Sequence, residues 1–526
     1  MATTYGAPGV YVEEVPSGSM PIQGVGTSTA AFVGFTQTYV PEEGDERDPE
    51  GVMPQLVTSW DQYERVYGGF DAGALLPYAV QGFFLNGGAQ CFVVRVPRDD
   101  AAPEAVVGTA ADPQVESFRV EAIEPVPNLQ VVVERPGPAG EGQEPPQEFT
   151  LRVLRDGRQL EEFGGLTFGR GGRNAEKVVN ETSTAVRVSV RQQAGAAGVE
   201  RLPAAGTFAL QRSPSATLQV RPEDFQGSAT DRTGVRGLVV ADSVSMVAAP
   251  DLITLATRAD GTFDMDGYIG MQGELVDWCE KSTTMMAILD APPGLNATAA
   301  LDWTTQLARS SSYAAAYYPH LVIRNPLAPP GATNGVRHMA VPPSGHVAGV
   351  WARTDATRGV HKAPANEAVR GVVRLERDVT AGEQDLLNPR GINCIRSFGA
   401  NGLRVWGART LSLTDPSWRY VPVRRLFIYL EESIRRGTQW AVFEPNDRDL
   451  WERVKRTINA FLRGVWRSGA LVGATPDQAF YVRCDESNNP ASSVDEGKLV
   501  VDVGVAPVKP AEFVIFRITQ WQGPTE

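Results

Sequence analysis

Both ends of the chain carry short β-forming runs, which constrain the fold because a strand at a chain end still needs a partner strand. Near the N-terminus, the run VYV at 10–12 lies between a Pro-Gly pair and the cluster PSG at 16–18. Near the C-terminus, the run FVIFRITQW at 513–521 is mostly apolar or β-forming. Exposed edges of this kind promote aggregation, and monomeric proteins usually suppress them. Each run therefore either pairs within its own domain or is donated to a neighbouring subunit as an added strand.

Length and composition narrow the class of protein. A chain of 526 residues exceeds the size at which one hydrophobic core keeps growing, so about two to four domains are expected. Its net charge of -13 disfavours nucleic-acid binding, because phosphate contacts need concentrated Lys and Arg. The four cysteines show no CxxC spacing, which indicates neither a zinc site nor a disulfide framework. Without a signal-peptide pattern or a bilayer-spanning apolar run, the sequence predicts a cytoplasmic protein with no membrane insertion.

The order of expected elements predicts a multidomain, mixed α/β fold with a β-rich insertion. Buried strands are expected at 29–35 and 91–96, with helices between them. Short strands alternate with Pro/Gly stretches in the insertion, where Asp156-Gly157 is a hairpin signal. Five segments follow: an N-terminal strand arm and hinge (1–26), the first part of the α/β domain (27–97), the β-rich domain (98–231), the second part of the α/β domain (232–386) and a C-terminal core (387–526).

The last two segments contain the most readable elements. A single strand is expected over 315–323, and strands are also expected at 439–443 and 513–521. One amphipathic helix is predicted over 422–436, and a second begins near Asn446 as its N-cap and runs to about Ser468.

The second helix has two contrasting faces. Its inner face is predicted to hold Leu450, Val454, Ile458, Phe461 and Val465, whereas the opposite face holds Glu452, Arg456, Asn459, Arg463 and Arg467. Over 421–470 there are ten Lys/Arg against six Asp/Glu, an excess of four in an acidic chain. Either the outer face is simply solvated, or its arginines form a basic stripe for an acidic partner surface. The stripe, defined as Arg456, Arg463 and Arg467, is the candidate contact for such a partner.

The sequence shows no catalytic or metal-binding signature. The motifs GxxxxGK[ST], HExxH and GxSxG are missing, and the four histidines are too scattered to predict a metal site. Asp264-Met265-Asp266-Gly267 lacks the ligands of a calcium loop and indicates a turn. Ser344 and His346 lie too close in sequence to face each other as a catalytic pair. No catalytic residue, cofactor site or metal site is predicted.

Four long stretches occur in a fixed order along the chain. They are YGAPGVYVEEVPSG with GVGTSTAAFVGF near the N-terminus, VPPSGHVAGVWARTDATRGVHKAPAN (341–366), LNPRGINCIRSFGANGLRVWGARTL (387–411), and VRRLFIYLEESIRRGTQWAVFEPND through APVKPAEFVIFRI. This series resembles the contractile tail sheath proteins of phages and of phage-tail-like contractile injection systems. The resemblance covers the N-terminal segment and nearly everything from 341 onward. The β-rich segment lies outside it, at a place where the family carries variable surface insertions.

The resemblance implies a structural, non-enzymatic subunit. Such subunits form a homo-oligomeric helical stack of hexameric rings around an inner tube protein, with a baseplate and a tail terminator or cap protein as further partners. From a metastable extended state the sheath contracts and drives the tube through a target envelope. Type VI secretion sheaths use two different polypeptides, whereas this single chain spans the whole pattern, so recycling by a dedicated ATPase is not expected.

The resemblance also implies that the C-terminal sheet is completed by strands from neighbouring subunits. The residues expected in these exchanged strands are Val10, Tyr11, Val12, Glu13, Glu14 and Val15 at one end and Phe513, Val514, Ile515, Phe516, Arg517 and Ile518 at the other. The basic stripe becomes the candidate contact with the inner tube. Pro16, Gly18, Pro21, Gly24 and Gly26 are expected to form a bendable hinge.

Two alternatives remain at this point. A baseplate or non-contractile tail protein could share the strand-donating arm, and an α/β hydrolase or other enzyme would require a polar constellation that the sequence does not show. The expected location is the cytoplasm during assembly and a phage virion or tail-like particle afterwards. The sequence leaves open whether that particle is a phage or a bacterial injection system.

Overall fold

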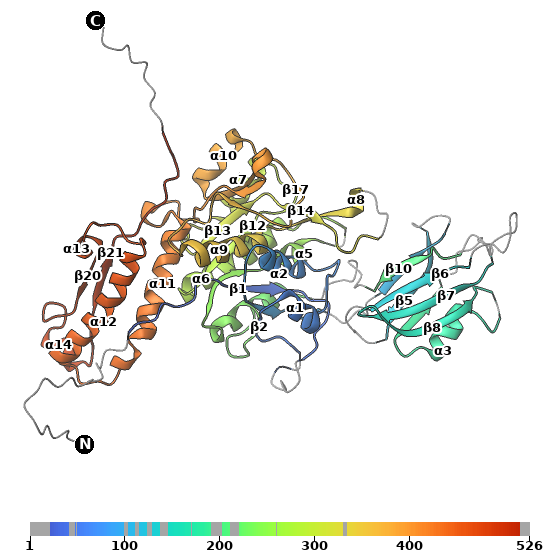
Figure 1. Cartoon of the computed structure of the whole chain (residues 1–526), viewed down its shortest axis with the longest axis horizontal. Helices are drawn as coiled ribbons and strands as arrows, with labels where there is room; N and C mark the ends of the chain where they lie inside the picture. The colour runs from blue at the N-terminus through green and yellow to red at the C-terminus, as the bar shows by residue number, and fades with distance from the viewer. Residues whose placement is uncertain are drawn as a thin grey trace, which may run out of the picture. The chain divides into compact units, whose positions relative to one another are not determined.

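The structure is a computed structural model. It describes residues 21–41, 48, 50–98, 104–110, 115–123, 129–136, 146–169, 171–190, 202–210, 220–258, 260–329 and 334–515 (Figure 1). These residues form two compact units. The large unit comprises the described residues of Gly26–Ile428 and Lys509–Glu526, and the small unit those of Met1–Val25 and Tyr429–Val508.

A nine-stranded sheet organises the large unit. Its order is β16-β19-β18-β13-β12-β11-β1-β3-β2, and the six strands from β18 to β3 run parallel. The edge strands β2 and β16, and β19 next to β16, are antiparallel to their neighbours. The strands are β1 (Thr29–Gly34), β2 (Gln55–Val57), β3 (Cys91–Arg95), β11 (Val244–Ala248), β12 (Met286–Asp290), β13 (Ala314–Tyr318), β16 (Glu367–Ala368), β18 (Ile392–Ser397) and β19 (Leu403–Val405).

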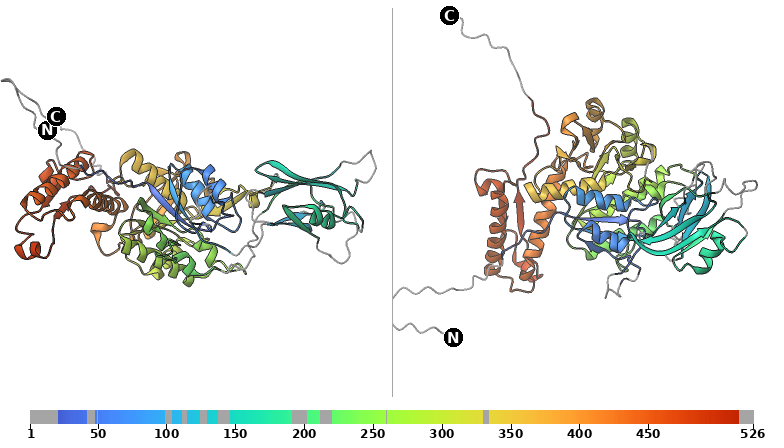
Figure 2. Two further views of the ribbon diagram at one scale, coloured as in Figure 1. Left: turned by 90° about the horizontal axis from the view of Figure 1, so that it is seen from below. Right: turned by 45° about the vertical axis from the view of Figure 1, so that its right-hand side comes forward.

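Helices cover both faces of this sheet, as Figures 1 and 2 show. Side chains alternate between the faces, so Ala30 and Phe32 of β1 enter one core and Ala31 and Val33 the other. The first core includes residues of α1 (Trp60–Tyr67), α2 (Leu76–Leu85) and α9 (Ser344–Arg358). The second includes residues of α5 (Leu252–Ala256), α6 (Met265–Ser282) and α7 (Ala297–Leu307). The predicted α/β class is confirmed in this sheet.

The β-rich segment has a hydrophobic core of its own. One sheet has the order β10-β6-β7-β8 and the other β4-β5-β9. Asp156 and Gly157, with φ of 52° and 74°, form the predicted turn between β7 and β8. The elements are β4 (Glu104–Gly108), β5 (Glu116–Ala122), β6 (Leu129–Glu134), β7 (Phe149–Arg155), β8 (Arg158–Leu166), α3 (Ala175–Thr182), β9 (Val186–Ser189) and β10 (Gly206–Ala209). Their core shares no residue with the two cores of the central sheet.

The strand expected over 315–323 is two strands, so that prediction was wrong in its extent. β13 ends at Tyr318 in the central sheet, and β14 (Leu321–Arg324) belongs to a three-stranded sheet with β15 (His338–Val341) and β17 (Arg374–Leu375). Pro319 separates the two strands, and a proline has no N–H to donate to a strand ladder. The remaining elements of the large unit are α4 (Pro222–Gln226), η2 (Val235–Val240), α8 (Asn334–Arg337), α10 (Ala381–Leu387), η3 (Asn388–Arg390), η4 (Gly399–Asn401) and η5 (Pro416–Trp418).

Two helices and a two-stranded sheet make up most of the small unit. It contains α11 (Val421–Gly437) from Tyr429 onward, η6 (Gln439–Ala441), α12 (Arg448–Arg467), α13 (Pro476–Ala479), β20 (Phe480–Arg483), α14 (Ala491–Asp495) and β21 (Asp502–Val505). The predicted inner face of α12 is confirmed, since all five of its apolar residues are buried. Asp447 rather than Asn446 caps this helix, and its side chain accepts from the Leu450 amide. The strand predicted over 439–443 is wrong, because a 3-10 turn occupies most of that stretch.

Candidate assembly surfaces

The small unit contains a sheet of only two strands. β20 and β21 are antiparallel, with Phe480 opposite Val505 and Arg483 opposite Asp502. Phe480 is buried, and β20 packs against α12. Within the described residues neither strand belongs to a larger sheet, so each has an edge without a partner strand. An edge of this kind exposes backbone N–H and C=O groups that can accept an added strand.

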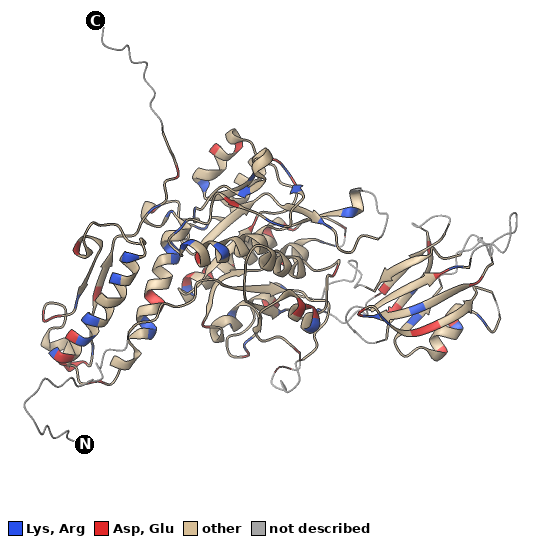
Figure 3. Ribbon diagram, in the orientation of Figure 1, with Lys and Arg blue, Asp and Glu red and all other residues tan. Residues whose placement is uncertain are grey.

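The basic stripe of α12 is exposed as predicted. Arg456, Arg463 and Arg467 are all exposed, and in the described part of the chain none of them forms an ion pair. Their neighbours Arg453 and Lys455 do form ion pairs, with Glu444 and Glu452. In Figure 3 several positions along the ribbon of this helix are blue, the colour of Lys and Arg. The stripe therefore presents three uncompensated positive charges on one helical face.

The segment that follows the N-terminal arm lies against α11 within the small unit. The Val25 amide donates to Ser433 Oγ at 3.1 Å. A Cβ on Gly24 would lie 2.2 Å from Tyr429 Oη, and a Cβ on Gly437 would lie 2.5 Å from Ile22 Cγ1. Gly24 is therefore required for close packing, which differs from its predicted role as a hinge. Gly26 has no such restriction, because nothing lies within 4 Å of its Cβ position.

A buried ion pair in the large unit fixes the chain directly after Gly26. Arg425 donates to both carboxylate oxygens of Asp355 at 2.8 and 2.6 Å and to the Thr27 carbonyl at 2.8 Å. Thr27 Oγ1 donates to the same carboxylate at 2.7 Å. The side chains of Arg425 and Asp355 are each only 2% exposed, and Arg425 also lies over the Trp351 ring. We call Thr27, Asp355 and Arg425 the N-terminal root.

A second arginine–carboxylate pair holds the chain directly before the C-terminal run. Arg409 donates to Glu512 Oε1 at 2.7 Å and to Oε2 at 2.6 Å. Asn388 and Tyr420 add hydrogen bonds of 2.8 and 3.1 Å to the same carboxylate. Burial opposes ionisation of Glu512, but the hydrogen bonds from Arg409 and Asn388 outweigh it and lower the pKa. We call these four residues the C-terminal root.

The structure places only some of the predicted strand residues. Val10 to Val15 and Phe516 to Ile518 lie outside the described residues. Phe513, Val514 and Ile515 are described, and they belong to no regular strand among the described residues. Their exposed fractions are 71%, 70% and 79%, which leaves three apolar side chains in solvent immediately after the C-terminal root.

Sequence reasoning missed both roots. Each root joins residues that are far apart in the chain, such as Arg409 and Glu512, and no local pattern marks such a pair. The only signal was positional, because Thr27 and Glu512 directly flank the predicted arms.

The polar residues considered for chemistry are dispersed or buried. Ser344 and His346 lie in α9 with exposed fractions of 0% and 2%, and burial lowers the pKa of His346 to about 4. Asp264 caps α6, accepting from the Gly267 amide at 3.1 Å. Among the described residues, no group of three or more His, Cys, Asp or Glu could hold a metal ion. Within the same ranges, every helix is too short or too polar to serve as a transmembrane span.

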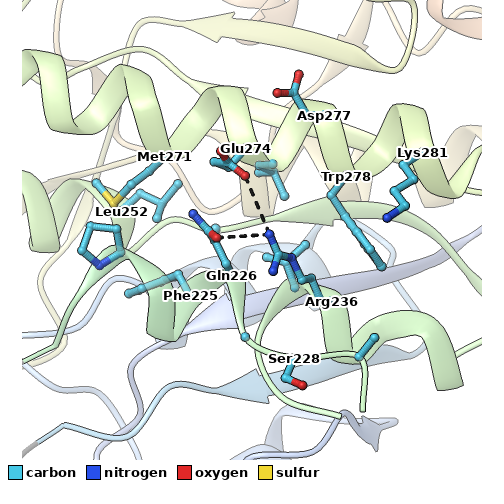
Figure 4. Close-up of a pocket in the computed structure, with 16 residues that line it drawn as sticks. Phe225, Gln226, Ser228, Arg236, Leu252, Met271, Glu274, Asp277, Trp278 and Lys281 are labelled. Atoms are coloured by element: carbon cyan, nitrogen blue, oxygen red, sulfur yellow. Dashed lines mark hydrogen bonds and ion pairs between the residues drawn. The ribbon is translucent and has the colours of Figure 1, made fainter. Parts of the chain in front are cut away.

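One cavity of about 490 Å³ opens between α4, η2 and α6 (Figure 4). Its lining includes Phe225 and Trp278, together with Arg236, which contacts Gln226 at 3.3 Å and Glu274 at 4.0 Å. The lining contains no histidine or cysteine. Its lining includes the hydroxyl of Ser228, but no imidazole that could act as the base for it, as in the common hydrolytic sites.

Two family models match adjacent parts of the chain. The phage tail sheath protein central domain matches residues 270–411, and the phage tail sheath C-terminal domain matches residues 414–520. Over these residues the chain belongs to the phage tail sheath family. The matched region includes β12, β13 and β18 of the central sheet, both roots except Thr27, and nearly all of the small unit.

Curated relatives are sheath proteins as well. The tail sheath protein of Burkholderia phage BcepMu is 25% identical over 379 residues, covering 67% of this chain and 71% of that protein. A tail sheath protein of Vibrio phage KVP40 is 31% identical, and a putative prophage major tail sheath protein of Pseudomonas aeruginosa is 32% identical. These two matches cover 34% and 36% of this sheath chain, and they span only 26% and 49% of the relatives' lengths.

Solved sheath structures share the fold over the whole length. A chain in the baseplate structure of the anti-feeding prophage is 23% identical with a TM-score of 0.57, covering 99% of this chain and 100% of that one. A chain of the PVC sheath complex in its contracted state gives 23% identity and a TM-score of 0.55, with 99% of both chains covered. The mixed α/β, multi-sheet architecture is therefore that of contractile sheath proteins.

Proposed function

We propose that this sheath chain is the structural subunit of a contractile tail or contractile injection system. The subunits polymerise as stacked six-fold rings around an inner tube, and they contract from a metastable extended state to drive the tube through a target envelope. The chain acts through assembly and a change of conformation rather than through catalysis. Assembly takes place in the cytoplasm, and the β-rich segment lies on the outside of the particle.

The observation that carries this proposal is the two-stranded sheet of the small unit. A sheet of two strands is marginal by itself, and both of its strands have a free edge within the described residues. The same chain has β-forming runs at its two ends, and Phe513 to Ile515 of one run are exposed. Added strands from two neighbouring copies would complete the sheet to four strands. Such contacts join different surfaces and do not close on themselves, so they generate a helical polymer.

The arms have the reach that strand exchange requires. About fifteen extended residues at about 3.3 Å each span some 50 Å, which is enough to reach an adjacent copy. The C-terminal root fixes where the C-terminal arm leaves the large unit, and the N-terminal root fixes the chain directly after the segment that packs on α11. The arms can therefore keep their pairing while the rest of each subunit reorients.

Removal of the N-terminal arm tests the proposal. A chain lacking Met1 to Val15 keeps the N-terminal root and the segment packed on α11, so it should remain folded while failing to form long sheaths. Circular dichroism and thermal melting check the fold, and negative-stain microscopy of purified particles measures sheath length. Tubes of normal length from this variant would refute the strand-exchange role. Two distinct sheath lengths in parent particles are expected from contraction, whereas a baseplate or non-contractile tail protein would give one.

We also propose that the basic stripe contacts the inner tube. Its three arginines are exposed and form no ion pair within the described residues, so they are available to an acidic partner surface. Reversing the charge of Arg456, Arg463 and Arg467 together should weaken retention of the inner tube protein in purified particles, more strongly at low salt. Reversal of Arg309, an exposed arginine of the large unit that pairs with Asp277, is the control. Unchanged tube retention in the triple variant would refute this contact.

A further inference from the structure

The turn between α11 and α12 presents two apolar side chains to solvent. Val442 is 63% exposed and Phe443 is 103% exposed, so the phenyl ring is as accessible as in an extended peptide. We call these two residues the 442–443 tip. Phe443 is the most exposed large hydrophobic residue in the described part of the chain. Burying an aromatic ring is among the larger favourable contributions a single side chain can make to an interface.

The backbone conformation of the tip is one that a bulky residue such as Phe443 rarely adopts. Val442 has φ and ψ of -72° and 132°, Phe443 has a φ of 66°, and the Glu444 amide donates to the Ala441 carbonyl at 3.3 Å. These values describe a type II turn, in which glycine or asparagine is favoured at the position of Phe443. A bulky side chain at positive φ is sterically disfavoured, and here its ring gains no compensating burial within the chain. Strained residues of this kind concentrate at binding sites, where contacts with a partner can offset the cost of the unfavourable backbone conformation.

We propose that the 442–443 tip is an interaction surface that inserts Phe443 into a second copy of this chain. This inference rests on the proposed sheath function, and it adds a contact made by side chains to the exchange of strands. Each copy carries one tip and one receiving surface, so the contact is heterologous and continues along the polymer without closing.

The position of the tip favours another copy as its occupant. Asn446, three residues beyond Phe443, donates to the Lys498 carbonyl at 2.9 Å. Lys498 precedes β21 by four residues, so the turn containing the tip is attached to the segment that leads into the unfilled sheet. A copy that adds a strand to this sheet therefore arrives beside the tip. The arriving copy also offers matching chemistry, because its Phe513, Val514 and Ile515 are exposed and apolar.

The inner tube is the other conceivable occupant, and the chemistry of the surface favours it less. The residues proposed to face the tube are the charged arginines of the basic stripe. The closest of these, Arg456, lies eight residues into α12, about 12 Å along the helix from its start. The tip itself carries no charge, so electrostatic attraction to an acidic tube surface would not select it.

Replacement of Phe443 by Gly tests the inference without endangering the fold. Glycine suits the type II turn, so the melting temperature of the monomeric subunit should stay the same or rise. The concentration at which the full-length chain polymerises, measured by sedimentation and negative-stain microscopy, should increase at least tenfold. Phe443→Asn, which also tolerates positive φ, should behave in the same way. The matched control is Leu386→Ala, which removes another apolar side chain of high exposure (63%) and should leave polymerisation unchanged.

The possible results separate this inference from the proposed function. A parent chain that polymerises, together with a Phe443→Gly chain that polymerises at the same concentration, would overturn the inference and leave the sheath function standing. Normal polymers of Phe443→Gly that lose the inner tube would also overturn it, because the occupant would then be the tube. A parent chain that never forms helical polymers would overturn both. A Phe443→Gly subunit that melts at a clearly lower temperature would show that the ring serves the fold, which also contradicts the inference.

Discussion

Replacing Glu512 by Gln should release the C-terminal run from the large unit without unfolding the chain. The Glu512 carboxylate accepts two hydrogen bonds from Arg409 and one each from Asn388 and Tyr420. A glutamine keeps the shape of the side chain but removes the negative charge and turns one acceptor into a donor. Arg409 then faces an amide in a setting where its own side chain is only 11% exposed.

The magnitude follows from the loss of charge-assisted hydrogen bonds. Hydrogen bonds to charged groups contribute about 1.5–3 kcal/mol each, and the amide retains part of the contact, so a net loss of about 2 kcal/mol is expected. At about 1.4 kcal/mol for each factor of ten, the undocked fraction of this segment should rise about 30-fold. The loss is local, because few other contacts depend on residues 509–515, and the melting temperature should change little.

Limited proteolysis of the monomer measures this release. Chymotrypsin can cut after Phe513 only when the neighbouring residues, including Glu512, leave their partners and extend into the protease. The cleavage rate therefore tracks the undocked fraction, and it should increase about 30-fold in Glu512→Gln. In an Arg409→Gln background the same change should add less than about threefold, because the two residues act as one unit.

The exposed Arg483–Asp502 pair provides the control for proteolysis. Its side chains are 55% and 36% exposed, and surface pairs of this kind contribute little. Asp502→Asn should therefore leave cleavage after Phe513 unchanged. The reasoning fails if Glu512→Gln is cut no more than about twice as fast as the parent, since the carboxylate would then not hold the segment.

Three further predictions concern stability and local packing. Asp355→Asn leaves the buried Arg425 without its anion and should lower the free energy of unfolding of the large unit by about 3–5 kcal/mol, measured by urea titration. A loss below about 1 kcal/mol would contradict a structural role for the N-terminal root. Burial raises the pKa of Asp290 to about 7, so the folded parent loses stability as pH rises above about 4, where the carboxyl group of the unfolded chain ionises. Asp290→Asn does not ionise and should be more stable than the parent by roughly 2–4 kcal/mol at pH 8, but no more stable near pH 4. A stability difference that does not change with pH would refute this prediction. Gly24→Ala should displace Tyr429 and speed amide hydrogen exchange at Val25, whereas Gly26→Ala should not; equal exchange in both variants would show that the contact with α11 is unimportant.

The central sheet and the faces of α12 were predictable because the burial of each element determines which of its sequence positions are apolar. Strands of a parallel sheet covered on both faces appear as continuous apolar runs, as in TAAFVG of β1 and CFVVR of β3. In α12, the five buried apolar residues recur at helical spacing. In each case the apolar pattern depends only on the type of element and on which of its faces are buried. The pattern can therefore be recognised without knowing which distant residues pack against the element.

The turn at 439–443 shows why a similar signal failed. The residues Trp-Ala-Val-Phe favour a strand, but this preference reflects packing against neighbouring strands rather than the backbone itself. No strand lies beside this stretch in the described part of the chain, so it forms a turn after α11 instead of a strand. The apolar character that suggested a strand belongs instead to an exposed tip, a local inconsistency of the kind expected at functional sites.

The roots could not be predicted for a different reason. Arg409 and Glu512 are 103 residues apart, and the chain offers 49 basic and 62 acidic residues from which pairs could form. Sequence alone gives no means of choosing among them, because ion pairing depends on where the fold brings side chains together. The two exchanged strands could be proposed only because arm segments at both ends carry β-forming residues and resemble those of a known family.

The separate core of the β-rich segment has a consequence for how the chain can change. Phe118, Val131, Leu151 and their neighbours bury one another without contributing to either core of the central sheet. Substitutions in this segment therefore need not be compensated in the α/β core, and the two can accumulate mutations at independent rates. For engineering, the segment is the natural place to graft a foreign module or a label, because an altered core there leaves the arms, the roots and the two-stranded sheet intact.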